Sequence, residues 1–142
     1  MTKHLKCLAS LHMIDANFMQ SIALLIARLW MAKVFFYAGL TKIKTWDSTL
    51  MLFEYEYAVP VLPTEVAAYM ATAGELSLPV LLALGLFTPI AALGLFIMTL
   101  VIELLVYPGT TEHYYWMILL VILMTQGSGK FGLDHFIKKR FL

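Results

Sequence analysis

Four ionisable side chains lie inside stretches of the sequence that are otherwise apolar enough to cross a lipid bilayer. Two are basic and two are acidic: Arg28, Lys33, Glu75 and Glu103. A charge near the centre of a membrane-spanning helix costs on the order of 2.5–3.5 kcal/mol, so such residues need a partner and are candidates for a functional site. The balance of charge predicts structural ion pairs that neutralise these four residues inside the protein.

Depth along the helix axes indicates which of these charges can pair. Depth is measured from the membrane face on which both chain termini are expected to lie. At a rise of about 1.5 Å per residue, Lys33 and Glu75 both lie roughly 18 Å from this face, and Arg28 roughly 10 Å. Depth therefore favours Lys33 as the partner of Glu75. Gly39 shares a stripe with Arg28 and lets a neighbouring helix come close, which favours Arg28 on the inward face. Glu103 is expected near the outer end of its helix, where it can reach water.

Pro79 adds a second polar feature to the stretch that contains Glu75. Proline has no N–H group, so the carbonyl of Glu75, four residues earlier, loses its helix partner. Inside a membrane, a neighbouring group or water must satisfy the freed acceptors. The charges can serve as structural salt bridges, as a site for a quinone headgroup near Arg28, Glu75 and Pro79, or as a relay for protons or small solutes. A relay needs polar residues on both sides of the membrane midplane. The halves of the second, third and fourth apolar runs on the expected cytoplasmic side have almost none, which argues against the relay.

The elements that must position these residues are four apolar runs, at about 21–43, 66–87, 89–107 and 113–127. The 142 residues are 61% hydrophobic and 13% charged, with a mean hydropathy of +0.83. Soluble domains have about 25% charged residues. A membrane-spanning helix needs ~20 residues, so the first three runs qualify and the fourth borrows length from its aromatic start. The sequence predicts an all-α, polytopic four-helix bundle in a membrane.

The connections predict further detail. Thr88 is expected to cap the third run, with Pro89 at its first helical position, which makes a tight hairpin. In the long connection 44–65, one helical face carries Trp46, Leu50, Phe53 and Tyr57. This pattern predicts a short amphipathic helix that rests on the membrane between the first and second spans. Residues 1–20 are expected to form a cytoplasmic interfacial segment, and 21–142 the transmembrane domain.

Charge and cysteine content exclude several classes of protein. The net charge is +1, and no basic patch is interleaved with aromatics, so nucleic acid is not an expected partner. Cys7 is the single cysteine, which excludes an internal disulfide and a CxxC pair. His4, Cys7 and His12 are too few ligands for a metal site, and no metal is expected. No arrangement of side chains predicts a catalytic nucleophile.

Three segments together resemble the DoxX family of small four-helix bacterial membrane proteins, over about residues 22–134. They are "ARLWMAKVFFYAGLTKI", with Arg28, Gly39 and Lys42; "GELSLPVLLALGLFTPIAA", with Glu75; and "GSGKFGLD", with Asp134. Their order and spacing carry the resemblance, because no single motif is diagnostic. Lys33 and Glu103 have no counterpart in the family pattern.

The resemblance implies a role near redox, sulfur or oxidative-stress chemistry, since the family is related to the membrane subunit of thiosulfate:quinone oxidoreductase. We expect an integral membrane subunit that mainly scaffolds partner subunits or a homo-oligomer and is not an enzyme on its own. The alternative is a quinone-binding oxidoreductase subunit, with the quinone held by Arg28, Lys42 and Glu75. The expected location is the bacterial inner membrane. Basic residues gather near the two ends of the chain, which predicts that both termini are cytoplasmic.

Overall fold

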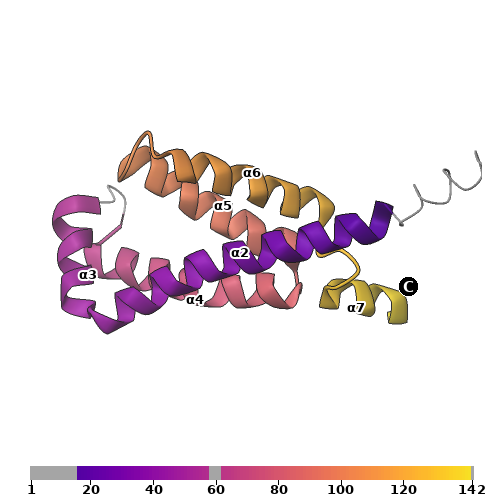
Figure 1. The fold of residues 1–142 in the computed structure, drawn as a ribbon. Coiled ribbons are helices and arrows are strands. Elements are labelled where there is room, and N and C mark those ends of the chain that lie inside the picture. The colour runs from indigo at the N-terminus through magenta and orange to yellow at the C-terminus, as the bar shows by residue number, and fades with distance from the viewer. Residues whose placement is uncertain (1–15, 58–61, 142) are drawn as a thin grey trace, which may run out of the picture.

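The computed structural model describes residues 16–57 and 62–141, and all regular elements within these two ranges are helices (Figure 1). The elements are α2 (Ala16–Lys44), α3 (Trp46–Leu52), a π-helix η1 (Phe53–Tyr57), α4 (Thr64–Leu84), α5 (Thr88–Leu105), α6 (Thr111–Gln126) and α7 (Leu133–Phe141). The all-α prediction is confirmed for this part of the chain. Residues 16–20 of the predicted N-terminal segment belong to α2, and the rest of that segment, 1–15, lies outside the described residues.

Three helices, α2, α4 and α5, are long and apolar enough to cross a membrane, judged by length and composition. They have 29, 21 and 18 residues. The 16 residues of α6 fall short of the ~20 that cross a bilayer core, although α6 packs along most of α5 (Figure 1). The three candidate spans thus support the prediction that the protein crosses the membrane more than once.

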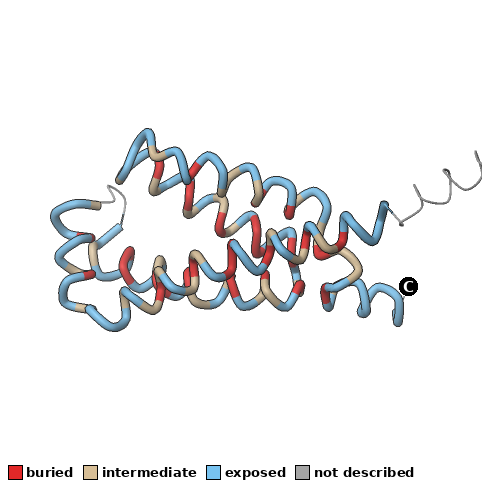
Figure 2. The backbone as a smooth tube through the Cα atoms, in the orientation of Figure 1, coloured by how far each residue is buried: buried red, intermediate tan, exposed pale blue. Residues whose placement is uncertain are grey.

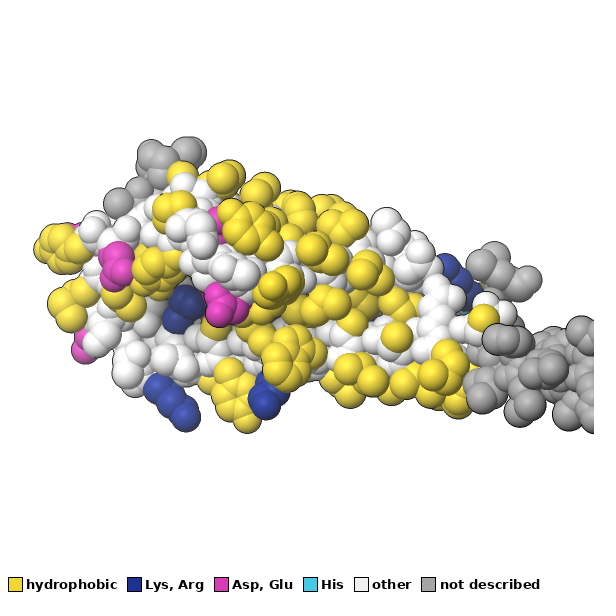
Figure 3. Space-filling model, turned by 45° about the horizontal axis from the view of Figure 1, so that its top comes forward, with side chains coloured by type: hydrophobic (Ala, Val, Ile, Leu, Met, Phe, Trp, Pro, Cys, Tyr) yellow, Lys and Arg dark blue, Asp and Glu magenta, His cyan; other side chains and the backbone are white. Residues whose placement is uncertain are grey.

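The core lies where α2, α4, α5 and α6 meet (Figure 2). Its fully buried members include Met31, Leu82, Leu95, Leu120 and Leu123, at least one from each of the four helices. Outside this core the surface is also apolar. In Figure 3, hydrophobic side chains cover the middle of the face shown, and acidic side chains gather toward the end that carries α3. A surface of this kind suits contact with lipid.

The short helix predicted between the first two spans is present as α3 and η1, and its apolar face packs on α4. Phe53 is buried against Ala67 and Ala68 at the start of α4, and Trp46, Leu50 and Tyr57 pack around them. The alanine side chains are small enough to let α3 and η1 lie close on α4. The two short helices therefore close one end of the bundle.

The α4–α5 hairpin is tight, as predicted, but Thr88 does not cap it. No side-chain cap comes from the helix's own N-terminal residues, and the Thr88 hydroxyl has no hydrogen-bond partner among the described residues. Instead the Asp134 carboxylate accepts hydrogen bonds from the backbone N–H groups of Phe87 and Thr88, at 2.8 and 3.0 Å. A carboxylate is the stronger cap because its charge also complements the helix dipole.

Candidate functional site

Glu75, in the middle of α4, forms an ion pair with Lys42 near the end of α2. The Lys42 ammonium donates to both carboxylate oxygens, at 2.8 Å for Oε1 and 2.7 Å for Oε2. The Glu75 side chain is almost completely buried, and that of Lys42 is 18% exposed. The predicted pairing of Glu75 with Lys33 or Arg28 is therefore wrong.

Helix geometry explains why Lys42 is the partner. Side chains on a helix lean toward its N-terminus, so the long stem of Lys42 reaches back from the end of α2 toward mid-helix depth. Gly39 brings the two helices together at this point, since a Cβ there would lie 2.9 Å from the Cγ of Leu76 and 3.1 Å from the Cβ of Glu75. Lys33, by contrast, is exposed on the outer face of α2.

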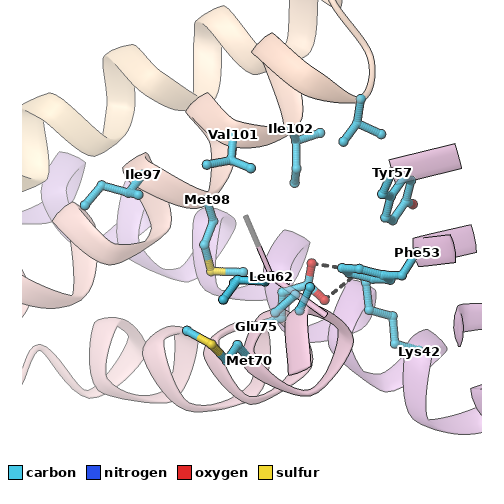
Figure 4. Close-up of a pocket in the computed structure, with 13 residues that line it drawn as sticks. Lys42, Phe53, Tyr57, Leu62, Met70, Glu75, Ile97, Met98, Val101 and Ile102 are labelled. Carbon is cyan, nitrogen blue, oxygen red and sulfur yellow. Dashed lines mark hydrogen bonds and ion pairs between the residues drawn. The ribbon is translucent and has the colours of Figure 1, made fainter. Parts of the chain in front are cut away.

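A cavity of about 290 Å³ adjoins this ion pair (Figure 4). Its walls come from α2, η1, the segment before α4, α4 itself and α5. Lys42 and Glu75 supply the charged groups and Tyr57 a phenol, whereas the other lining side chains are hydrophobic. Ligand pockets typically combine such an apolar wall with a few converging polar groups, at volumes of about 300–1,000 Å³. The cavity is at the small end of that range.

A pair of tyrosines lies at the outer end of the cavity. Tyr57, from η1, lines the cavity and packs edge-on against Tyr107, with ring centroids 6.1 Å apart. The Tyr107 hydroxyl donates to Oε1 of Glu56 at 2.6 Å, and this bond raises the pKa of Tyr107 well above its ordinary value. Burial is the main cause of a raised pKa at Tyr57. The contacts fasten η1 to the segment after α5, so they close this end.

Glu103 does not reach water, contrary to the prediction. Its side chain is buried. Oε1 accepts a hydrogen bond of 2.7 Å from the backbone N–H of Gly109, and Oε2 forms a hydrogen bond of 2.7 Å with Nδ1 of His113. His113 is buried as well. The pair joins α5 to α6 across the Pro108–Gly109 turn. It is a structural connection that the charge pattern alone did not identify.

Arg28 lies at the opposite end of the bundle from Glu75, about 21 Å from Lys42 along α2 at about 1.5 Å per residue. Its side chain is fully buried, and Nη2 donates to the carbonyl of Phe131 at 3.2 Å. The guanidinium packs against Gly85 and Gly132, where any Cβ would collide with it. The predicted site near Arg28, Glu75 and Pro79 is therefore divided between two places.

Asp134 completes the arrangement around Arg28. It caps α5 through its carboxylate, and its backbone N–H donates to the carbonyl of Gly85 at 2.9 Å. The negative charge of the Asp134 carboxylate attracts the positive charge of the Arg28 guanidinium. Together, Arg28 and Asp134 hold the segment before α7 against the α4–α5 turn.

The described residues form helices, three of which are candidate membrane spans, and an ion pair joins two of these spans; these features are typical of a small helical membrane protein. Residues 23–108 match the model of the DoxX family, which is more than half of the chain. The chain therefore belongs to the DoxX family, and the resemblance stated above is confirmed.

One relative adds coverage beyond the matched domain. An uncharacterized protein of Haemophilus influenzae is 31% identical over 134 residues, covering 83% of this chain and 85% of that protein. No solved structure matches the chain. All the lining residues of the cavity, Lys42 and Glu75 included, fall inside residues 23–108, whereas Asp134 lies outside that range.

Proposed function

We propose that this DoxX protein is an integral membrane subunit of a redox-associated assembly, and that it binds a quinone-class headgroup beside Lys42 and Glu75. The observation that carries the proposal is the cavity next to the ion pair, because it joins a buried polar end to an apolar wall. The electrons for any quinone chemistry would come from a partner subunit. The chain itself would hold and orient the ligand.

The ion pair favours an uncharged ligand with a hydrogen-bond acceptor. An ammonium group has three N–H donors, and Lys42 uses two of them on Glu75. The third can donate to a carbonyl oxygen in the cavity, which is the group that a quinone presents. Because Lys42 and Glu75 already neutralise each other, a ligand with a net charge would be left without a counter-charge in an apolar site.

The proposed setting is the bacterial inner membrane, with α2, α4, α5 and α6 as four spans and both termini in the cytoplasm. The last turn of α7 carries Lys138, Lys139 and Arg140 at the terminal end of the bundle. An excess of basic residues at the cytoplasmic ends of the spans favours this orientation. The cavity, near α3 and η1, would then be nearer the outer side.

Binding to the purified protein in nanodiscs tests the site. We expect wild-type protein to bind a benzoquinone, measured by quenching of tryptophan fluorescence. The double variant Lys42→Met/Glu75→Leu should weaken binding at least tenfold, because it removes the polar end while keeping the volume filled. Lys44→Met is the matched control, since it removes an exposed lysine of the same helix that lies outside the cavity wall. Wild-type protein that binds no benzoquinone, or a double variant that binds like wild type, would overturn the proposal.

The scaffolding role has its own support, from Lys33. This exposed lysine lies about 16 Å before the end of α2 at about 1.5 Å per residue, in a shallow groove with Trp30 and Tyr37. A charge on the outer face of a span is costly against lipid. We propose that an acidic residue of a partner subunit or of a second copy covers it. Lys33→Leu should then reduce the mass of the assembly in mild detergent, and an unchanged mass would count against this role.

A further inference from the structure

The cavity beside Lys42 and Glu75 has a second, apolar end on the outer surface of the bundle. Leu62, in the segment before α4, is 40% exposed, and three lining side chains within helices are exposed as well: Met70 is 61% exposed, Ile97 51% and Val101 37%. Met70 belongs to α4, and Ile97 and Val101 to α5, which are both candidate membrane spans. Figure 4 shows these side chains around the cavity, on the α4 and α5 walls. The mouth therefore lies between two spans.

The groove between α4 and α5 is closed on the side toward their connecting turn. There Leu78 of α4 packs against Gly94 of α5, where an added Cβ would lie 2.6 Å from a Leu78 methyl group. Met98 packs against Gly74 in the same way, with its sulfur 3.0 Å from the position of a Cβ. Beyond this contact the cavity begins, so the opening is confined to the half of the groove nearer α3.

At the end of the cavity nearer α3 and η1, two described aromatic side chains form a cover, in contrast to the mouth between the spans. Phe53 and Tyr57 lie over the end of the cavity, and Phe53 is buried in the cluster with Ala67 and Ala68. The bond of 2.6 Å between Tyr107 and Glu56 fastens this cover. A ligand that approached under η1 would have to displace Phe53 and Tyr57, whereas a ligand dissolved in lipid meets exposed apolar side chains at the mouth.

We propose that the ligand enters sideways from the bilayer through the mouth formed by Met70, Ile97 and Val101, and leaves an apolar tail in it. The ligand class is an uncharged amphipath with a carbonyl head at Lys42 and a hydrocarbon tail long enough to reach lipid. This inference rests on the proposed quinone-class site and adds the tail and the route. It also accounts for a cavity too small to enclose a whole lipid.

A photoreactive ligand tests the route in wild-type protein. The probe is a benzoquinone whose alkyl tail carries a diazirine, added to the protein in nanodiscs and mapped by mass spectrometry of the labelled peptides. We expect labels on α4 near Met70 and on α5 near Ile97 and Val101. An excess of unlabelled tailed benzoquinone should remove them. Labels confined to α3 and η1 would overturn lateral entry while leaving the head site intact.

A blocking variant provides the second test. Ile97→Trp fills the mouth and should slow association of the tailed benzoquinone at least fivefold, measured by stopped-flow quenching. Ile90→Trp is the matched control, because Ile90 is also an exposed isoleucine of α5, two turns from the mouth and outside the cavity wall. A tailless benzoquinone should associate equally fast with both variants. If Ile97→Trp and Ile90→Trp take up the tailed compound at the same rate, the route is wrong although the binding site stands.

Discussion

Helix α2 directs one basic side chain into each end of the bundle, and the two environments differ in packing. Lys42 meets a carboxylate directly, at 2.7 Å, and has an open cavity beside it. Arg28 is enclosed by Gly85 and Gly132 and donates to a backbone carbonyl. Both cations face the interior, Arg28 fully buried and Lys42 partly, but a cavity adjoins Lys42, whereas Gly85 and Gly132 pack closely against Arg28. Burial of a charge therefore does not identify a binding site; the volume next to it does.

The difference assigns separate roles to the two ends. Arg28 and Asp134 join segments that lie about a hundred residues apart, and they fix the start of α7 on the α4–α5 turn. Rigid packing suits that purpose. The Lys42 end is covered by the short helices α3 and η1, and π-helical turns such as η1 are frequent at functional sites. Substitutions at the two ends should therefore differ: those at the Arg28 end should affect folding alone, and those at the Lys42 end should also affect ligand binding.

The largest effect is expected from breaking one half of the Lys42–Glu75 pair. Lys42→Met leaves the Glu75 carboxylate buried without its counter-charge, and such a change costs about 3–5 kcal/mol. The double variant Lys42→Met/Glu75→Leu should recover most of this loss, because apolar side chains of similar volume replace the pair. The measurement is reversible unfolding in mixed micelles of mild detergent and SDS. Equal loss in the single and double variants would show that the pair itself holds the bundle together.

Gly85→Ala should destabilise the Arg28 end by about 2–4 kcal/mol, from left-handed backbone strain together with overpacking. Gly85 has φ of 68°, and a Cβ there would collide with Arg28. Gly109→Ala is the matched control: its φ is 82°, but nothing lies within 4 Å of the added Cβ. It should lose only the strain, about 1–2 kcal/mol. The same unfolding assay compares them, and equal losses would argue against tight packing at Arg28.

Asp134→Ala should cost about 0.5–2 kcal/mol, because it removes the cap from α5. The Asp134 carboxylate accepts hydrogen bonds from the backbone N–H groups of Phe87 and Thr88, and these bonds attach the start of α7 to the α4–α5 turn. The substitution should therefore also release α7. Limited proteolysis should then cut after Lys138 or Lys139 faster than in wild type. Quinone binding at the other end should stay unchanged. A loss of binding in this variant would show that the two ends are coupled.

The sequence predicted the helices well, because apolar runs of sufficient length and their punctuation by Pro and Gly are local properties. It also identified Glu75 as buried. It did not identify Lys42 as the partner, because Lys42 stands near the end of its helix, and the reach of its side chain depends on how Gly39 packs on α4. The contact of Arg28 with the segment before Asp134 depends on the path of a distant loop, which no local pattern specifies.

Other misses had a usable signal. Glu103 and His113 flank the Pro108–Gly109 turn, so an antiparallel pair of helices would bring them to similar depth on neighbouring helices. Only pairs among Lys, Arg, Asp and Glu were predicted, so His113 was missed as the partner of Glu103. Tyr57 was expected at the membrane surface, but its contact with Tyr107 depends on the folded position of η1. Local physics fixes the elements, whereas packing decides which polar groups meet.

The smallest effect is expected from Tyr107→Phe, which keeps the ring contact with Tyr57 and removes the hydroxyl that donates to Glu56. A single hydrogen bond contributes about 0.5–1.5 kcal/mol, and less where water competes, so stability should change little. The cover over the cavity should loosen, however. A tailless, water-soluble benzoquinone should then associate faster than with wild type in stopped-flow quenching, while a tailed one that enters from lipid keeps its rate. Faster uptake of the tailed compound alone would instead place its route under η1, because removing the Tyr107–Glu56 bond leaves the mouth between α4 and α5 unaltered.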